Sequence, residues 1–176
     1  MIYKNLLILI IQSFWFIAPA YAANAFPPVI KGKRPIDFNK TLWKKPILGK
    51  GKTIEGTIGG ILFGIFVGLV QLYFQPFIKN HIPLIELSPL SIVLLSVGAI
   101  VGDIVASFFK RRAGIKRGEP VPLMDQLDFI IGAFVFTYPL IRLPVFHLLF
   151  IIIITPIIHL LANGIGFIFK LKKVPY

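Results

Sequence analysis

The chain has 176 residues, of which 56% are hydrophobic and only 15% are charged. With a mean hydropathy of +0.84, it is too apolar to present water-facing surface on all sides, which excludes an ordinary soluble domain. It contains no cysteine, so disulfides, thiolate metal sites and cysteine nucleophiles are also excluded. The net charge of +12 would fit a nucleic-acid-binding protein. The positions of the basic residues favour a membrane protein instead, and we expect no nucleic-acid partner.

Long uncharged runs predict the transmembrane helices. Four runs of 26, 23, 16 and 27 residues carry no charge: Asn5–Ile30, Gly56–Ile78, Leu87–Gly102 and Leu143–Phe169. A helix needs roughly 20 apolar residues to cross a bilayer, so three of these runs can span by themselves. The run that starts at Leu87 reaches that length only if it continues through Asp103 to Phe109.

A further helix is predicted around Phe129–Ile141, where only 13 residues are uncharged. It reaches spanning length only by starting near Pro122 and including Asp125 and Asp128. We therefore predict an all-α integral membrane protein with about five transmembrane helices, forming a single transmembrane domain over residues 1–176. The predicted helices cover about residues 5–26, 57–77, 87–109, 122–141 and 144–169.

The lysines and arginines predict the orientation. Eight lie between the first and second predicted helices, five between the third and fourth, and three after the fifth. The N-terminus and the two remaining loops hold one each. Cytoplasmic loops carry an excess of basic residues, so we expect a multi-pass cell-membrane protein with its N-terminus outside and its C-terminus inside. Alternatively, these charges only set the orientation and contact anionic head groups.

The first predicted helix includes Ala20-Tyr21-Ala22, which resembles the cleavage site of a secretory signal peptide. Cleavage there would leave the loop with eight basic residues outside the cell, against the charge bias. We therefore predict that this segment is retained as a transmembrane helix.

Three aspartates lie at the predicted cytoplasmic edge of the membrane, where a charge is costly and usually has a partner. Asp125 and Asp128 are three residues apart and share a helical face, while Asp103 follows a long uncharged run. Carboxylates supply the hard oxygen ligands that Mg²⁺ takes up together with substrate phosphates. On spacing alone, a set of internal ion pairs at helix ends explains these residues equally well.

Further polar residues follow Asp103 at a spacing that places them on the same side of a helix. They are Ser107, Lys110 and Arg111, and Lys116 lies in the short basic loop that comes next. Lysine and arginine suit phosphate oxygens. The combination therefore favours metal-assisted chemistry on a phosphorylated substrate, with the site on the cytoplasmic side.

A second candidate segment is Gly49–Gly56, a glycine-rich basic turn before the second predicted helix. Its Gly-Lys-Thr core resembles a phosphate-binding P-loop, but Pro46 stands where the first glycine is required and no strand precedes it, so we reject that motif. Backbone amides at a helix N-terminus can still bind an anion. Four glycines in the following helix, at mostly fourfold spacing, favour close helix packing.

Over roughly residues 15–133 the chain resembles the CTP-dependent CDP-lipid synthases, and within them most closely the archaeal type. The similar segments are Pro19-Ala20-Tyr21, Pro35–Phe38, Gly51–Gly56, Gly102-Asp103, Ser107-x-x-Lys110-Arg111, Lys116 and Asp125-x-x-Asp128. Ile54 replaces the usual tryptophan of the family. Pro122-Leu123-Met124 replaces the His-Gly-Gly of the broader family, a shorter form that the archaeal branch shares.

The resemblance implies a nucleotidyltransferase that joins CTP to a membrane lipid phosphate, di-O-geranylgeranylglyceryl phosphate in the archaeal branch, and releases pyrophosphate. Such a transfer depends on positioning and charge neutralisation more than on a protein nucleophile. By this resemblance, the catalytic residues would be Asp103, Lys110, Arg111, Asp125 and Asp128. The three aspartates would hold Mg²⁺. The substrate-binding residues would be Lys52, Thr53, Glu55, Ser107 and Lys116.

Three other functions remain open on the sequence alone. A CTP:phosphatidate cytidylyltransferase acting on an ester lipid would carry the same motifs. A small transporter would place polar groups near the bilayer midplane and contain an inverted repeat, and the sequence shows neither. A structural membrane subunit would not require acidic residues at membrane depth.

Overall fold

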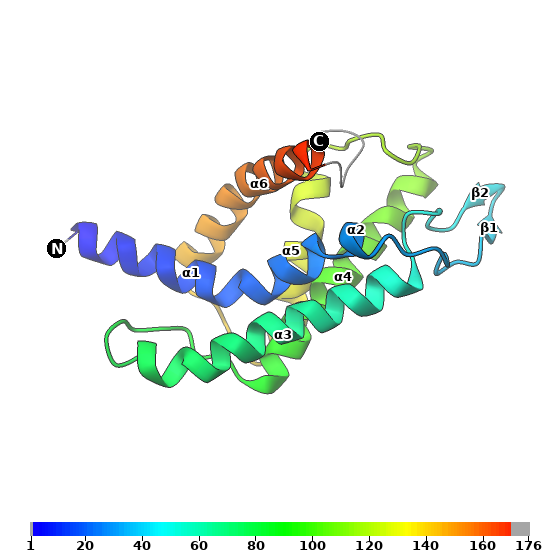
Figure 1. Cartoon of the computed structure of the whole chain (residues 1–176). Helices are drawn as coiled ribbons and strands as arrows, with labels where there is room; N and C mark the ends of the chain where they lie inside the picture. The colour runs from blue at the N-terminus through cyan, green and yellow to red at the C-terminus, as the bar shows by residue number, and fades with distance from the viewer. Residues whose placement is uncertain (1, 170–176) are drawn as a thin grey trace.

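The computed structural model describes residues 2–169, which form six helices and one two-stranded hairpin (Figure 1). The long helices are α1 (Ile2–Ala25), α3 (Ile54–Ile78), α4 (Pro89–Arg112) and α6 (Val145–Ile168). The short elements are α2 (Pro27–Ile30), β1 (Thr41–Leu42), β2 (Lys45–Pro46) and α5 (Met124–Thr137). The long helices begin and end within three residues of their predicted ranges. The hairpin was not predicted.

Four stretches of the described residues are long and apolar enough to cross a membrane: Tyr3–Ile30, Ile54–Ile78, Pro89–Arg112 and Val145–Ile165. Each exceeds the roughly 20 residues that a bilayer-spanning helix needs. The prediction of an all-α, multi-pass membrane protein is therefore confirmed.

Helix α5 is shorter than predicted. It begins at Met124 instead of residue 122, and it ends at Thr137 instead of residue 141. Pro139 has no amide hydrogen with which to continue the helix, and Leu123 precedes the helix with a left-handed φ of 65°. The 14 residues of α5 extend for about 21 Å, less than the ~30 Å thickness of a bilayer core. Five spans and the orientation of the chain therefore stay predictions.

Side chains determine where α3 and α4 begin. Thr53 caps α3, because its Oγ1 accepts a hydrogen bond from Gly56 N at 3.1 Å. Ser88 and Ser91 form a reciprocal capping box at the start of α4. Helix α4 ends in three basic residues, Lys110–Arg112, which are favourable at the negative end of a helix dipole.

Helices α1 and α4 lie at the centre of the bundle, and α4 packs against α1, α3 and α5 (Figure 1). The core between them includes Phe16, Ile92 and Leu95, all fully buried. A Cβ atom added at Gly60 or Gly64 would lie 2.7 Å from a backbone oxygen of α1. The predicted role of these glycines in helix packing is confirmed.

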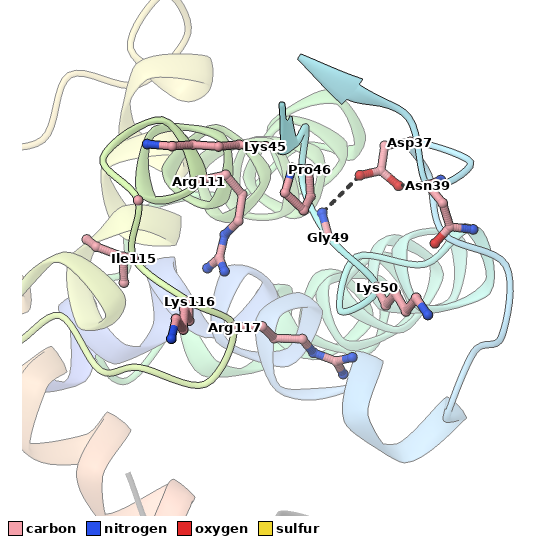
Figure 2. Close-up of a pocket in the computed structure, with 11 residues that line it drawn as sticks. Asp37, Asn39, Lys45, Pro46, Gly49, Lys50, Arg111, Ile115, Lys116 and Arg117 are labelled. Atoms are coloured by element: carbon pink, nitrogen blue, oxygen red, sulfur yellow. Dashed lines mark hydrogen bonds between the residues drawn. The ribbon is translucent and has the colours of Figure 1, made fainter. Parts of the chain in front are cut away.

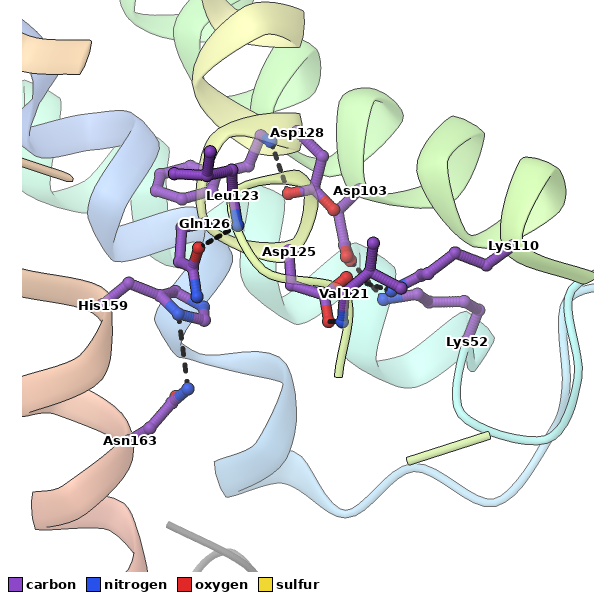
Figure 3. A network of polar contacts seen from close by, with 11 residues as sticks. Lys52, Asp103, Lys110, Val121, Leu123, Asp125, Gln126, Asp128, His159 and Asn163 are labelled. Atoms are coloured by element: carbon purple, nitrogen blue, oxygen red, sulfur yellow. Dashed lines mark hydrogen bonds and ion pairs between the residues drawn. The ribbon is translucent and has the colours of Figure 1, made fainter. Parts of the chain in front are cut away.

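Helices α4 and α5 also approach closely through glycines. A Cβ atom added at Gly98 would lie 2.6 Å from the backbone oxygen of Gly132, and one at Gly102 would overlap the backbone oxygen of Asp128. This close approach brings Asp103, the next residue of α4, beside Asp128 of α5 (Figure 3).

The segment between α2 and α3 folds back at the end of the bundle where α3 begins and α4 ends (Figure 1). Ile54 N donates to Arg34 O at 2.8 Å, so the chain entering α3 pairs with the start of this segment. Strands β1 and β2 form an antiparallel hairpin. Trp43 and Lys44 make its turn with left-handed φ values of 50° and 62°. Two segments far apart in the sequence, the loop before α3 and the end of α4, therefore meet.

Candidate active site

An ion pair joins the loop before α3 to helix α4. Lys52 Nζ lies 2.5 Å from Asp103 Oδ2. The two side chains are only 25% and 23% exposed, so the pair is shielded from most of the solvent. The start of α3 thus places Lys52 beside an acid that the sequence analysis assigned to the site.

A second ion pair joins α4 to α5. Lys110 Nζ lies 2.5 Å from Asp125 Oδ1, and the Lys110 side chain is only 13% exposed. The other oxygen of Asp125 accepts a hydrogen bond from Val121 N at 3.0 Å. Both oxygens of Asp125 therefore have partners, one on α4 and one in the loop that leads into α5 (Figure 3).

Asp128 lies in the same group, next to Asp103 (Figure 3). Its Oδ1 accepts a hydrogen bond from Phe129 N at 2.6 Å. Its carboxylate lies beside that of Asp103, which pairs with Lys52 (Figure 3). Five residues singled out in the sequence therefore lie in one group in the structure: Lys52, Asp103, Lys110, Asp125 and Asp128.

The chemistry of this network suits Mg²⁺. Asp103 and Asp128 offer hard carboxylate oxygens from two adjacent helices, and Mg²⁺ is commonly held by one or two carboxylates, waters and substrate phosphates. Within residues 2–169, no three histidine, aspartate or glutamate side chains are close enough to form a metal site by themselves. The carboxylates therefore fit a cation whose coordination is completed by phosphate oxygens. They do not form an all-protein cage.

The loop before α3 and the loop after α4 line a cavity of about 500 Å³ (Figure 2). It lies between the segment before α3 and the segment after α4, and most of the charged side chains that line it are basic. These are Lys45, Lys50, Arg111, Lys116 and Arg117. Converging cations in a concave site attract polyphosphate anions.

Two of the residues predicted from the sequence, Arg111 and Lys116, line this cavity. Arg111 Nε is buried and has no hydrogen-bond partner among the described residues, so a bound anion could satisfy it. Lys45, Lys50 and Arg117 were missed as site residues. In the sequence they are part of the basic loops, and nothing local separates them from the lysines that only orient the protein.

Asp37 was also missed, and it is the acidic side chain at the cavity wall. Its carboxylate accepts hydrogen bonds from Leu48 N and Gly49 N, both at 2.9 Å, and from Asn39 N at 3.0 Å. Burial acts to raise the pKa of Asp37, but these backbone donors outweigh it and lower the pKa below its ordinary value. Asp37 therefore holds the loop in shape from inside. The signal in the sequence that could have identified Asp37 is its position as a lone acid within a strongly basic loop.

The remaining predicted substrate-binding residues make local contacts. Thr53 caps α3. Glu55 pairs with Arg34, whose Nε lies 2.8 Å from Glu55 Oε1. Ser107 is buried on α4, between Asp103 and Lys110 in the sequence. Their direct part in substrate binding stays a prediction.

A second, apolar cavity runs between α4 and α5, with a volume of about 530 Å³. Its lining is almost entirely hydrophobic and includes Val105, Phe109, Leu127 and Ile131. Asp128 belongs to the same lining. One face of the acidic network therefore borders on an apolar groove.

Comparison with known proteins gives consistent results. Residues 6–176 match the family described as CarS-like, CDP-archaeol synthase. The chain is 43% identical to the CDP-archaeol synthase of Pyrococcus abyssi, over 95% of this chain and 98% of that relative. It is 42% identical to the CDP-archaeol synthase of Methanocaldococcus jannaschii, over 94% of this chain and 97% of that one.

A solved structure is also similar. It is described as an intramembrane enzyme for the biosynthesis of archaeal membrane lipids. It superimposes with a TM-score of 0.75 at 33% sequence identity, covering 87% of this chain and 93% of the other.

Proposed function

The chain belongs to the CarS-like family of CDP-archaeol synthases, and on that premise we propose that it transfers the cytidylyl group of CTP to an archaeal ether lipid phosphate. The lipid is di-O-geranylgeranylglyceryl phosphate, and the products are CDP-archaeol and pyrophosphate. The enzyme is thus a nucleotidyltransferase of membrane phospholipid biosynthesis. Its substrates are one soluble nucleotide and one lipid of the bilayer.

The observation that carries this proposal is that the C-terminal turn of α4 contributes both to a cationic cavity and to an apolar groove. Phe109 lines the groove, Lys110 pairs with Asp125, and Arg111 lines the cavity. In the proposed arrangement, the triphosphate of CTP binds in the cavity and the lipid chains lie in the groove. A site for two soluble substrates has no need of the groove.

The reaction is an in-line displacement at phosphorus. An oxygen of the lipid phosphate attacks the α-phosphorus of CTP, a new P–O bond forms, and the bond to the bridging oxygen of the β-phosphate breaks. Pyrophosphate leaves with the electron pair. Positioning and electrostatic stabilisation dominate such transfers. Lys110, Arg111 and Lys116 bind the phosphate oxygens, and Lys52 completes the site from the opposite loop.

Mg²⁺ held by Asp103 and Asp128 would neutralise phosphate charge in this site, while Asp125, the third predicted ligand, is held by Lys110 and Val121 N. The chain's own contribution is orientation. Lys52 and Lys110 hold Asp103 and Asp125 through the two ion pairs, and the close packing of α4 on α5 keeps Asp128 beside Asp103. Thr53 and Glu55 fix the start of α3 and with it the position of Lys52.

We place the site on the cytoplasmic side of the cell membrane, within a single transmembrane catalytic domain. The loop before α3, the end of α4 and the loop after it together carry thirteen of the nineteen lysines and arginines of the chain, and basic segments that flank transmembrane helices stay in the cytoplasm. Helix α5 is the fourth and shortest of the five spans in this arrangement, with the N-terminus outside.

Pyrophosphate release by the purified protein tests the proposal. The reaction mixture contains the protein in detergent micelles, CTP, the lipid phosphate and Mg²⁺. We expect pyrophosphate only when all four are present. Release with ATP or GTP at the same rate, or without the lipid phosphate, would contradict it.

A further inference from the structure

The side chain of Arg112, the last residue of α4, binds backbone carbonyl oxygens of the β1–β2 hairpin. Its guanidinium donates hydrogen bonds to the carbonyl oxygens of Leu42 and Pro46, and to that of Lys45 at 3.2 Å. Three carbonyls from both strands thus converge on a single planar cation. A guanidinium can satisfy them together because its donors form a rigid fork.

Two aromatic rings also contact the guanidinium of Arg112. Its carbon atom lies 5.8 Å from the ring centroid of Trp43 and 5.4 Å from that of Phe108. These distances are within the range of cation–π attraction. Trp43 belongs to the turn of the hairpin and Phe108 to α4, so the rings come from the two parts that Arg112 joins.

The contact is reciprocal. Lys45 Nζ donates to Arg112 O at 3.1 Å, so the hairpin also satisfies a carbonyl left free at the C-terminus of α4. We call Arg112, Lys45 and the carbonyl oxygens of Leu42 and Pro46 the Arg112 latch. Charged hydrogen bonds of this kind are stronger than neutral ones.

The latch lies where the two walls of the cationic cavity meet. One wall continues from the hairpin through Pro46, Gly49 and Lys50, and the other begins with Arg111 and continues to Arg117. Lys45 itself belongs to both the latch and the cavity lining. The separation of the two walls therefore depends on the hairpin staying on the end of α4.

We propose that Arg112 is a positioning residue, which fixes the hairpin to α4 and thereby sets the width of the nucleotide cavity. The effect of Arg112 on nucleotide binding rests on the proposed function, whereas its role in fixing the hairpin to α4 does not. Arg112 makes no contact with substrate in this account and acts only through Lys45, Lys50 and Arg111.

Spin-label distance measurements test the mechanical link. The natural chain has no cysteine, so Thr41→Cys in the hairpin and Leu90→Cys near the start of α4 provide two specific labelling sites. Leu90 and Arg112 are about 33 Å apart along the helix, which places the labels in the measurable range. Both positions are exposed and outside the latch and the cavity.

We expect one narrow distance distribution in the otherwise unchanged protein and a clearly broadened one in Arg112→Ala. Arg112→Lys should also broaden it, because an ammonium keeps the charge but lacks the planar fork. Arg142→Ala is the matched control, since Arg142 also lies over an aromatic ring, at 5.6 Å from Tyr138, but outside the latch. A distribution as narrow in Arg112→Ala as in the control would overturn the proposal.

Steady-state kinetics separate positioning from general destabilisation. Arg112→Ala should raise the KM for CTP about tenfold while kcat at saturating CTP changes less than about threefold, because the reacting groups remain in place. An unchanged KM for CTP, or an equal loss in kcat and kcat/KM, would overturn the positioning role. The distance measurement needs no activity, so failure of the proposed function in the unchanged protein is recognised separately.

Discussion

Lys52 Nζ lies 2.5 Å from Asp103 Oδ2, although the two residues are 51 positions apart. Lys52 belongs to the loop before α3 and Asp103 to α4. Their ion pair brings the glycine-rich basic turn into contact with the acidic signature segment. In the sequence, only the resemblance and the shared predicted cytoplasmic side connected them.

If Lys52 contributes to the phosphate site, its loss should impair use of CTP strongly. We expect Lys52→Ala to cost about 2–4 kcal/mol in catalytic efficiency, the scale for removing one partner of a buried charge pair. Lys110→Ala should cost a similar amount. The free-energy loss of the double variant should differ from the sum, because both residues share one ligand and one acidic network.

Lys40→Ala is the control for this series, since Lys40 is exposed in the same basic loop and does not line the cavity. It should leave kcat/KM for CTP within about twofold of the unchanged enzyme. If Lys52→Ala has unchanged CTP kinetics, Lys52 and the loop before α3 do not belong to the active site.

Asp128→Asn tests the carboxylate that borders both the network and the apolar groove. The substitution keeps the shape but removes a charged oxygen, so we expect activity to fall by about two orders of magnitude or more. Stabilisation of the protein by Mg²⁺ in the presence of CTP, measured as a shift in Tm, should also be lost. The second readout does not require turnover.

Glu86→Gln is the matched acid control, because Glu86 is exposed in the loop between α3 and α4 and pairs only with Lys79 among the described residues. Its activity and its Tm shift with Mg²⁺ and CTP should match those of the unchanged protein. If Asp128→Asn behaves like this control, the carboxylate has a structural role only.

Long uncharged runs made the four long helices predictable, because few other structures accommodate more than 20 apolar residues. The acids of the network were predictable for a related reason, whereas Lys52 and Lys110 were singled out through the glycine-rich turn, the helical spacing and the family resemblance. A charged residue next to such an apolar run has a high free-energy cost in the membrane, so it is easily recognised in the sequence. Both ends of α5 differ from the prediction, because Leu123 with its positive φ precedes the start and Pro139 follows the end of a helix that composition alone would have extended.

Three of the five basic residues that line the cavity were not predictable. Lys45, Lys50 and Arg117 have the same local context as the lysines that face solvent, and only the folded loops separate the two groups. Asp37 and Arg112 were overlooked because their partners are backbone atoms. Any residue type can supply a backbone N–H or carbonyl, so such contacts leave no pattern in the side chains.

Asp37 should make the stability of the protein depend on pH in a defined window. Its folded-state pKa is lowered, so its contribution is fully present above the ordinary aspartate pKa of about 3.9 and is lost as the pH falls through the lowered value. Asp37→Asn should therefore have a lower Tm than the unchanged protein at pH 7. The difference should narrow only below about pH 4. If the difference in Tm between the two proteins already disappears between pH 7 and pH 5, a group other than Asp37 causes the effect.

The topology can be tested in the same cysteine-free background. Lys45→Cys and Lys116→Cys should resist a membrane-impermeant thiol reagent added to intact cells and react after the cells are opened, because both loops are strongly basic. Lys79→Cys, in the loop between α3 and α4, should react from outside. Labelling of residue 45 or 116 in intact cells would contradict the cytoplasmic placement of the site.

The central claim is that the lipid phosphate attacks the α-phosphorus of CTP, and the fate of isotopic label tests it most directly. The purified protein is supplied with di-O-geranylgeranylglyceryl phosphate, Mg²⁺ and CTP labelled either at the α-phosphate or at the γ-phosphate. We predict that the α-label enters the lipid phase and that the γ-label stays in water as pyrophosphate. Transfer of the γ-label to the lipid would identify a kinase instead, and absence of both labels from the lipid would contradict the account.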